Sequence, residues 1–236
     1  KTINSPITRL VSLLNCRYTR LLSLLIQYHS PMATRGRPKS DQKHIQILDA
    51  AAELFTSNGY AKTSLEQLAA AADVSRQTIY SHFADKADVL REAVKYRCEQ
   101  RLLSVEHVDY SIAPQQFLRE FAHRFIALLS DEGALKMYRL CVHEGVRYPE
   151  LGEAFFEAGP GMVGQVLSTY LEVANDRGEL CVQQPEIAAM QFLFAVRGYP
   201  VDRLLLNAPE QAYAFDDQDY IEYCCQSFLK AHAPSQ

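Results

Sequence analysis

The sequence is poor in the residues that break helices and form tight turns. Its 236 residues include only 10 glycines and 10 prolines, and no segment shows sustained apolar/polar alternation with hairpin turns. A β-sandwich or β-barrel is therefore not expected. Long apolar runs are also missing, because none approaches the roughly 18 residues of a membrane-spanning helix. An integral membrane protein is not expected either.

Catalytic and metal-binding motifs are missing as well. The sequence contains no HExxH motif, no Gly-rich phosphate loop, no Ser/His/Asp nucleophile motif and no CxxC pair among its six cysteines. His143 beside Glu144 is the one candidate for a ligand or metal site, although such a pair is more typical of an ordinary surface histidine. We therefore predict a protein that is not an enzyme, with no metal and no cofactor. Its thiols are expected to be reduced and mostly buried, with a redox-sensing thiol as the alternative.

Positive charge is concentrated at one end of the chain. The net charge is −4, but residues 1–44 carry eight Lys or Arg and one acid, whereas residues 96–236 carry eleven bases and twenty acids. A basic arm on an acidic body indicates that one end meets a polyanion. Residues 1–31 precede Met32 and are predicted to be a leader or appended segment. Residues 7–28 have helical apolar spacing and basic polar positions, as a helix on a membrane surface does. A peripheral membrane-associated regulator anchored by this segment is therefore kept as the alternative to the function predicted at the end of this section.

Helical periodicity dominates the rest of the sequence. Apolar residues in 41–58 recur at helical spacing, and Gly59 fits a left-handed cap. Thr63 and Glu66 predict a capping box for a helix over 66–72, Ser75 is expected to cap a third helix over 76–83, and Asp85 a fourth from 86 to about 105. Further helices are expected near 113–130, 132–147, 150–158, 160–177, 185–206 and 217–232. The predicted fold class is all-α.

The third of these helices has two distinct faces. Ile79 and Phe83 share an inward face, whereas Gln77 and Ser81 lie on the opposite side. Two short helices joined by a tight turn after a longer helix are typical of a helix-turn-helix. On this pattern alone, a solvated face of an ordinary helical hairpin is equally compatible.

Residues 63–86 add a resemblance, since they read TSLEQLAAAADVSRQTIYSHFADK. This run resembles the DNA-binding domain of TetR-family transcriptional regulators, and the likeness extends over about 45–90. Asp73 departs from the family, which most often has Gly in the turn, although Asp tolerates a left-handed backbone. The resemblance implies base contacts from Arg76, Gln77 and Ser81. It implies phosphate contacts from Thr63, Ser64, Thr78, Tyr80, His82 and Lys86.

The segment ahead of the first helix resembles the core of an AT-hook. Arg35, Arg37 and Lys39 lie close together around Gly36 and Pro38. An arm that enters the adjacent minor groove is expected. The alternative is a basic tail that adds affinity without sequence preference.

The C-terminal part resembles the AefR-type domain of the same family, in the segments MYRL (137–140), RYPEL (147–151), FEAGP (156–160) and PEIAA (185–189). The resemblance implies a ligand-binding and dimerisation domain, in which the helices 185–206 and 217–232 pair with their twins. Candidate dimer contacts are Tyr220, Tyr223, Cys224 and Phe228. The candidate ligand-binding residues, which are also compatible with a plain helical core, are Phe121, Phe125, Tyr138, Phe155, Met162, Val166, Tyr170, Phe194 and Arg197.

The sequence thus predicts four parts: a leader (1–31), a basic arm (32–44), a helix-turn-helix domain (45–95) and a helical ligand-binding and dimerisation domain (96–236). The expected function is that of a cytoplasmic homodimeric repressor, with no stable membrane association. It would bind a palindromic double-stranded DNA operator and be released by a small, mainly hydrophobic inducer.

Overall fold

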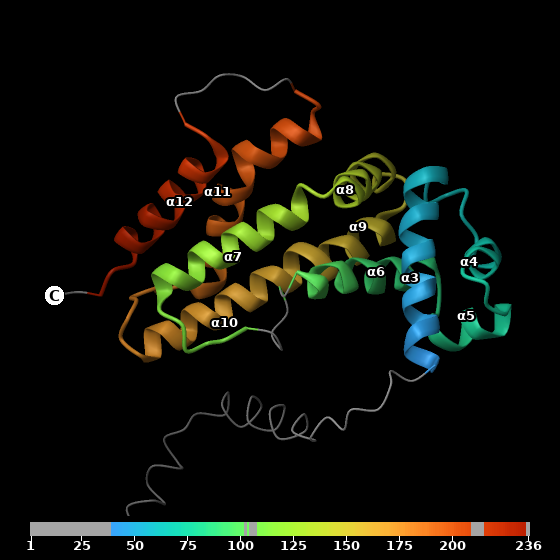
Figure 1. Cartoon of the computed structure of the whole chain (residues 1–236), viewed down its shortest axis with the longest axis horizontal. Coiled ribbons are helices and arrows are strands. Elements are labelled where there is room, and N and C mark those ends of the chain that lie inside the picture. Colours follow the sequence, from blue (N-terminus) through green and yellow to red (C-terminus); the bar gives the residue numbers. More distant parts are fainter. Residues whose placement is uncertain (1–38, 102, 104–107, 209–214, 235–236) are drawn as a thin grey trace, which may run out of the picture. The chain divides into compact units, whose positions relative to one another are not determined.

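The computed structural model describes residues 39–101, 103, 108–208 and 215–234, and every regular element among them is helical (Figure 1). This confirms the predicted all-α class. The elements are α3 (Lys39–Asn58), α4 (Leu65–Ala71), α5 (Arg76–His82), α6 (Lys86–Gln100), α7 (Pro114–Leu129), α8 (Glu132–Glu144), α9 (Pro149–Phe156), a π-helical turn η2 (Glu157–Gly161), α10 (Met162–Asp176), α11 (Pro185–Leu205) and α12 (Asp217–Ala231).

Short polar side chains set the starts of the first helices. Ser64 caps α4 and forms a capping box with Gln67, so the predicted box between Thr63 and Glu66 is wrong by one residue. The reason is that Thr63 is only 1% exposed and its hydroxyl donates to the carbonyl oxygen of Gly59 at 2.8 Å. Ser75 and Asp85 cap α5 and α6 as predicted.

Two residues with left-handed backbone shape the connections. Gly59 ends α3 with φ of +88° and donates its N–H to the carbonyl oxygen of Phe55 at 3.0 Å. Asp73 adopts φ of +50° in the turn between α4 and α5, where an aspartate tolerates this conformation. The turn is thus kept without glycine, as predicted. Helix α6 ends at Gln100, earlier than the predicted end near residue 105.

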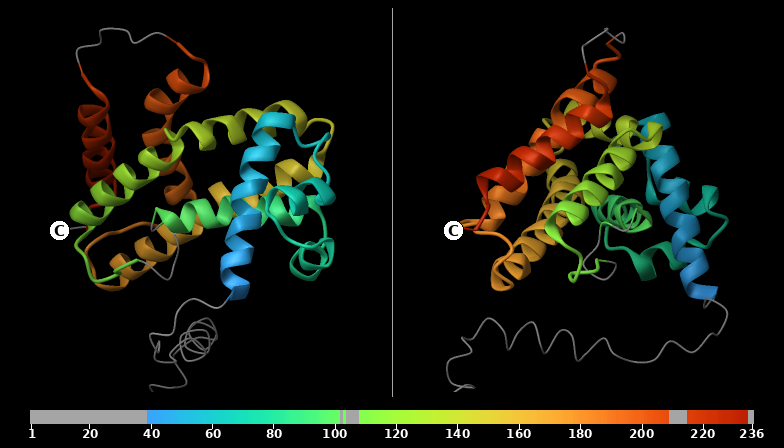
Figure 2. Two further views of the ribbon diagram at one scale, coloured as in Figure 1. Left: turned by 45° about the vertical axis from the view of Figure 1, so that its right-hand side comes forward. Right: turned by 60° about the vertical axis from the view of Figure 1, so that its left-hand side comes forward.

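Helices α3 to α6 share a hydrophobic core with the C-terminal part. Phe55, Ile79 and Phe83 pack in one cluster with Leu151 and Ala154 of α9. Figures 1 and 2 show α4 and α5 beside α3, and α6 lies along α9 and η2. Residues from Ser40 to the C-terminus form one compact unit, and the boundary expected at 95/96 falls inside α6. Helix α6 therefore belongs to both parts.

A second core fills the C-terminal body, which comprises helices α7 to α12. Helices α7, α10, α11 and α12 bury it, and α11 continues through Pro200. Phe228 packs inside this core against Phe192, with ring centroids 5.1 Å apart, so its predicted role as a dimer contact is wrong. Tyr220 donates its hydroxyl to the carbonyl oxygen of Ala195 at 2.8 Å.

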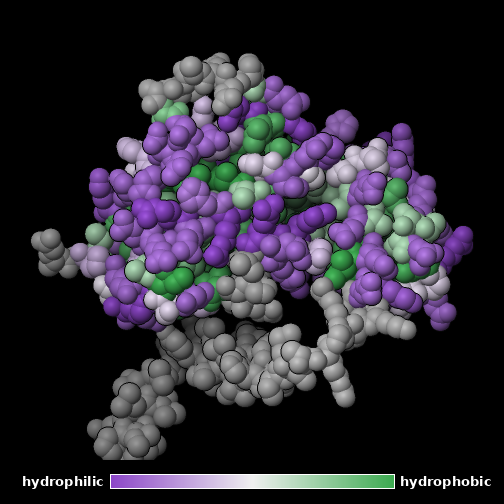
Figure 3. All heavy atoms as spheres, viewed as in Figure 1, coloured by the Kyte–Doolittle hydropathy of each residue, from purple (hydrophilic) through white to green (hydrophobic). Residues whose placement is uncertain are grey.

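The face of the molecule seen in Figure 3 is largely hydrophilic, with smaller apolar patches. Exposed large apolar side chains include Ile187 and Phe194 on α11 and Tyr223 on α12, which is 73% exposed. None of the described helices is long and apolar enough to cross a membrane. The basic amphipathic segment 7–28 lies outside the described residues.

Candidate DNA interface and internal cavity

Helix α5 presents one polar face to solvent. Arg76, Gln77, Ser81 and His82 are exposed, while Ile79 on the opposite face is fully buried. This confirms the two-faced arrangement that the sequence predicts. An exposed row of guanidinium, amide, hydroxyl and imidazole groups suits base edges and phosphate oxygens.

Hydrogen bonds fix the aromatic and hydroxyl groups of this face. Tyr80, which is 56% exposed, donates its hydroxyl to Glu66 Oε1 on α4 at 3.1 Å. This bond raises the pKa of Tyr80, because it stabilises the protonated phenol. Thr78 Oγ1 lies 2.9 Å from Ser75 Oγ. A phosphate that binds the Tyr80 hydroxyl has to replace Glu66 as its acceptor.

Two predicted phosphate contacts are used inside the protein. Thr63 is buried and its hydroxyl is bonded to Gly59, so we remove Thr63 from the set of DNA contacts. Lys86 donates from Nζ to the carbonyl oxygen of Tyr60 at 2.8 Å and lies 4.4 Å from the centre of the Tyr60 ring. Burial lowers the pKa of Lys86, which remains partly exposed. Lys86 thus remains able to face DNA from one side.

The basic arm is mostly outside the described residues. Arg35 and Arg37 lie there, and Lys39 is placed only as the first residue of α3. Their proposed minor-groove contacts therefore remain a prediction from sequence.

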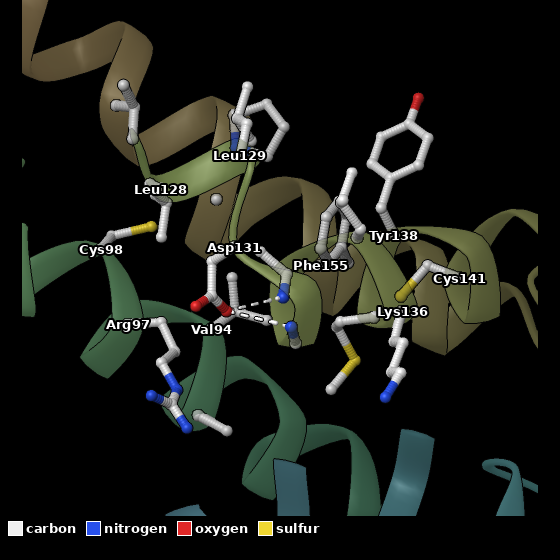
Figure 4. Close-up of a pocket in the computed structure, with 18 of the residues that line it drawn as sticks. Val94, Arg97, Cys98, Leu128, Leu129, Asp131, Lys136, Tyr138, Cys141 and Phe155 are labelled. Atoms are coloured by element: carbon white, nitrogen blue, oxygen red, sulfur yellow. Dashed lines mark hydrogen bonds between the residues drawn. The ribbon is translucent and has the colours of Figure 1, made fainter. Parts of the chain in front are cut away.

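A cavity of about 1020 Å³ lies where the DNA-binding helices meet the C-terminal body. Its walls come from α3, α6, α7, α8, α9, α10 and α11. Figure 4 shows Val94 and Cys98 of α6 across from Leu128 of α7 and Phe155 of α9. Five of the nine predicted ligand-binding residues line this cavity: Phe125, Tyr138, Phe155, Phe194 and Arg197.

The other four predicted ligand-binding residues lie elsewhere. Phe121, Val166 and Tyr170 are buried in the core of the C-terminal body, where Tyr170 donates its hydroxyl to the carbonyl oxygen of Ile112 at 2.6 Å. Met162 is partly buried against the same core. These residues have helical spacing, as core residues do, and the sequence does not tell which face of α10 borders the cavity.

The sequence reasoning also missed the cavity residues that come from the DNA-binding helices. Asp49, Glu53 and Thr56 of α3 and Arg97 of α6 line the cavity. Their spacing resembles that of any polar helix face, so no signal in the sequence distinguishes them. A molecule in this cavity would touch two helices of the DNA-binding part directly.

Two arginines of the cavity wall form ion pairs. Arg97 lies 3.6 Å from Asp49, and Arg197 lies 3.0 Å from Asp202. Arg197 also donates to the Tyr138 hydroxyl at 3.2 Å and lies 5.9 Å from the Phe194 ring centre. The cavity wall therefore combines aromatic and aliphatic surface with charged side chains, of which Arg97 and Arg197 are held in ion pairs.

Two thiols face this cavity without being reactive. Burial raises the pKa of Cys98 and that of Cys141 to about 12, so both remain protonated at neutral pH. In the described part of the chain, no group of three or more His, Cys, Asp or Glu side chains is placed to hold a metal ion.

Comparison with known proteins assigns both halves of the chain. The family described as bacterial regulatory proteins of the tetR family matches residues 47–93, and the AefR-like transcriptional repressor C-terminal domain matches residues 116–234. The chain belongs to the TetR family. Its exposed α5 face and this membership make it a DNA-binding transcriptional repressor.

Individual relatives of the TetR family agree with this assignment. The solved structure of the flavonoid-responsive regulator FrrA is 30% identical, with a TM-score of 0.66, covering 83% of this chain and all of that one. The transcriptional repressor BepR of Brucella suis is 24% identical over 170 residues, which are 70% of this chain and 81% of BepR. The regulator AcrR of Shigella flexneri is 41% identical over 61 residues, 26% of this chain, which spans only 28% of AcrR.

Proposed function

We propose that this repressor binds a palindromic DNA operator as a homodimer and is released by a small, mainly hydrophobic ligand. The observation that carries the proposal is the cavity of about 1020 Å³, whose wall includes α3 and α6 of the DNA-binding part. A ligand that fits only one arrangement of these helices would shift the population toward that arrangement. The protein would act in the bacterial cytoplasm and would catalyse no reaction.

The DNA contacts follow the exposed face of α5. Arg76, Gln77 and Ser81 would read base edges in the major groove. Phosphates would be held by Ser64, Thr78, Tyr80, His82 and Lys86. Arg35, Arg37 and Lys39, in the arm over residues 32–44, would reach the adjacent minor groove.

Dimerisation would use α11 and α12. Ile187 and Phe194 are both 54% exposed on α11, seven residues apart and hence on one side of the helix. Tyr223 is exposed on α12, and Cys224 is half-buried beside it. These side chains would pack against their copies, as the family likeness suggests, and would set the spacing of the two α5 helices.

The cavity favours a ligand with aromatic or aliphatic surface. Phe155 and Tyr138 meet edge to face with ring centroids 5.8 Å apart, and Phe194 and Arg197 lie nearby. A ligand that buries about 300 Å² of apolar area gains roughly 7 kcal/mol at about 25 cal/mol per Å². Micromolar affinity corresponds to about 8 kcal/mol net of association costs, so hydrogen bonds from a polar head, or a larger buried area, would have to add to this gain. A neutral ligand or one with a single polar head suits a wall that is mainly apolar and whose Arg97 and Arg197 are held in ion pairs.

Selection of duplexes from a random pool tests the proposal for DNA. We expect an enriched palindrome with half-sites one helical turn apart, or multiples of it, because two α5 helices would enter successive major grooves. A ligand screen against that palindrome should then return apolar compounds that release it. Enrichment of no sequence, or of a single half-site only, would count against a dimeric operator-binding repressor.

A further inference from the structure

The last residue of α8 holds the loop that follows α3. Glu144 Oε1 accepts the backbone N–H of Tyr60 at 3.2 Å, and Glu144 Oε2 accepts that of Ala61 at 3.0 Å. The two partners are 84 and 83 residues away in the sequence. A carboxylate that takes two successive N–H groups makes charge-assisted bonds, which are stronger and more directional than neutral ones.

The same loop is held from its other side by α6. Lys86 donates to the Tyr60 carbonyl oxygen, so the N–H of Tyr60 is bound by α8 and its carbonyl by α6. The Tyr60 ring is buried, with its centroid 5.5 Å from that of Phe55 and 5.7 Å from that of Tyr148. This loop connects α3 to α4, and α4 packs on α5. The position of this loop therefore sets the position of α4 and α5 together.

Gly59 leaves room for this contact. A Cβ atom at this position would lie 2.7 Å from Glu144 Oε1, and φ of +88° already favours glycine. The close approach of the carboxylate to the loop thus depends on a residue without a side chain.

Helix α8 also reaches the cavity and α11. Tyr138 lines the cavity, six residues before Glu144. Arg139 donates to the carbonyl oxygens of Leu204 and Leu205 at the end of α11, at 2.6 and 3.0 Å. One helix of thirteen residues therefore contacts the cavity, the helix proposed to dimerise and the loop of the DNA-binding part.

We propose that Glu144 is the positioning residue through which the C-terminal body sets the placement of α4 and α5. A movement of α8 at Tyr138 would reach the DNA-binding helices through this carboxylate. The regulatory meaning of this inference rests on the proposed ligand response. The clamp, by which we mean the two hydrogen bonds from Tyr60 and Ala61 to Glu144, is testable without a ligand.

Three variants separate positioning from charge: Glu144→Ala, Glu144→Gln and the control Glu150→Ala. Glu150 acts electrostatically on Lys86, as Glu144 does, but makes no described hydrogen bond to the loop. Each Ala variant removes one negative charge near Lys86. On charge alone, both should tighten binding to every duplex by about two- to threefold.

Positioning predicts that, of the two Ala variants, only Glu144→Ala loses preference for the operator. Fluorescence anisotropy without ligand, on the selected operator and on a scrambled duplex, should show Glu150→Ala binding both slightly more tightly. Glu144→Ala should lose about 5–30-fold of its preference for the operator over the scrambled duplex. Glu144→Gln should fall between Glu144→Ala and the unaltered protein, because one amide oxygen still accepts a bond.

Amide hydrogen exchange supplies a readout that does not need DNA. Exchange at Tyr60 and Ala61, and throughout α4 and α5, should speed up in Glu144→Ala and stay unchanged in Glu150→Ala. If Glu144→Ala does not fold, Glu144→Gln carries both measurements. The inference is overturned if Glu144→Ala matches Glu150→Ala in both assays, or if exchange in α4 and α5 is unaltered. If no duplex is preferred even by the unaltered protein, the proposed operator fails, while exchange still decides on the clamp.

Discussion

Gly152 offers a way to fill the cavity with little disturbance of the surrounding structure. It lies on α9 and lines the cavity, and a Cβ atom built there meets no heavy atom within 4 Å. Since the natural chain contains no tryptophan, Gly152→Trp would place the only indole of the protein in the cavity. An indole buried among Phe155 and other apolar residues should emit blue-shifted fluorescence.

The magnitude follows from the area that a ligand would lose. Burying one large apolar side chain contributes about 1.5–3 kcal/mol. A ligand denied the space of one ring should lose a comparable amount, which is about 10–150-fold in affinity. We therefore expect Gly152→Trp to bind operator normally and to need about 10–150-fold more inducer for release.

The control for this prediction is Gly152→Ala. Alanine in place of glycine inside a helix should stabilise the fold by about 0.5–1 kcal/mol, and it should leave the inducer response nearly unchanged. Operator release followed by anisotropy against inducer concentration measures both variants. Blue-shifted emission from Gly152→Trp, which shows the indole in the cavity, together with an unaltered inducer response would refute the cavity as the ligand site. Val166, one of the ligand-binding residues predicted from the sequence, is unsuitable for such a test because it lies in the core of the body.

Three further predictions concern DNA recognition and stability. Gln77→Ala should change the preferred operator bases in a selection experiment, whereas Lys86→Ala should weaken binding to all duplexes and lower the salt slope by about one; unchanged preference in the first would exclude base reading. Thr63→Val should cost about 1 kcal/mol in urea unfolding, because the buried acceptors lose their donor, and should leave operator preference intact; altered base preference would contradict the structural role of Thr63. The Glu222 pKa is lowered from 4.5 to about 2, chiefly by hydrogen bonds from Arg119, so this pair should stabilise the fold above pH 4.5 and lose its contribution as the pH falls toward 2. Solvent screens the pair, so its contribution is small, and Glu222→Gln should remove that part of the acid sensitivity of unfolding.

Local signals in the sequence were sufficient for the DNA-binding part. Ser75 and Asp85 cap helices where short polar residues precede apolar periodicity, and Ile79 and Phe83 point inward as their spacing of four requires. The error at Thr63 has the same local origin. Thr63 and Ser64 are both good capping residues, and only the tertiary fold decides that Thr63 is buried against Gly59.

The cavity was predicted less well because it depends on how distant helices pack. Aromatic residues on α8, α9 and α11 were correctly placed around it, but the inward residues of α10 belong to a separate core. Helical periodicity tells that Val166 and Tyr170 are buried and does not tell which helices they face. The bond from Glu144 to the loop after α3 likewise spans more than eighty residues, so no local pattern announces it.

The central claim is that an occupied cavity and operator binding oppose each other. Calorimetric titration of an inducer into the free protein and into the operator-bound protein measures this coupling directly. We predict that the inducer binds the operator-bound protein about 5–150-fold more weakly, and that the inducer weakens operator binding by the same factor. Equal inducer affinity for the free and the operator-bound protein would contradict the claim.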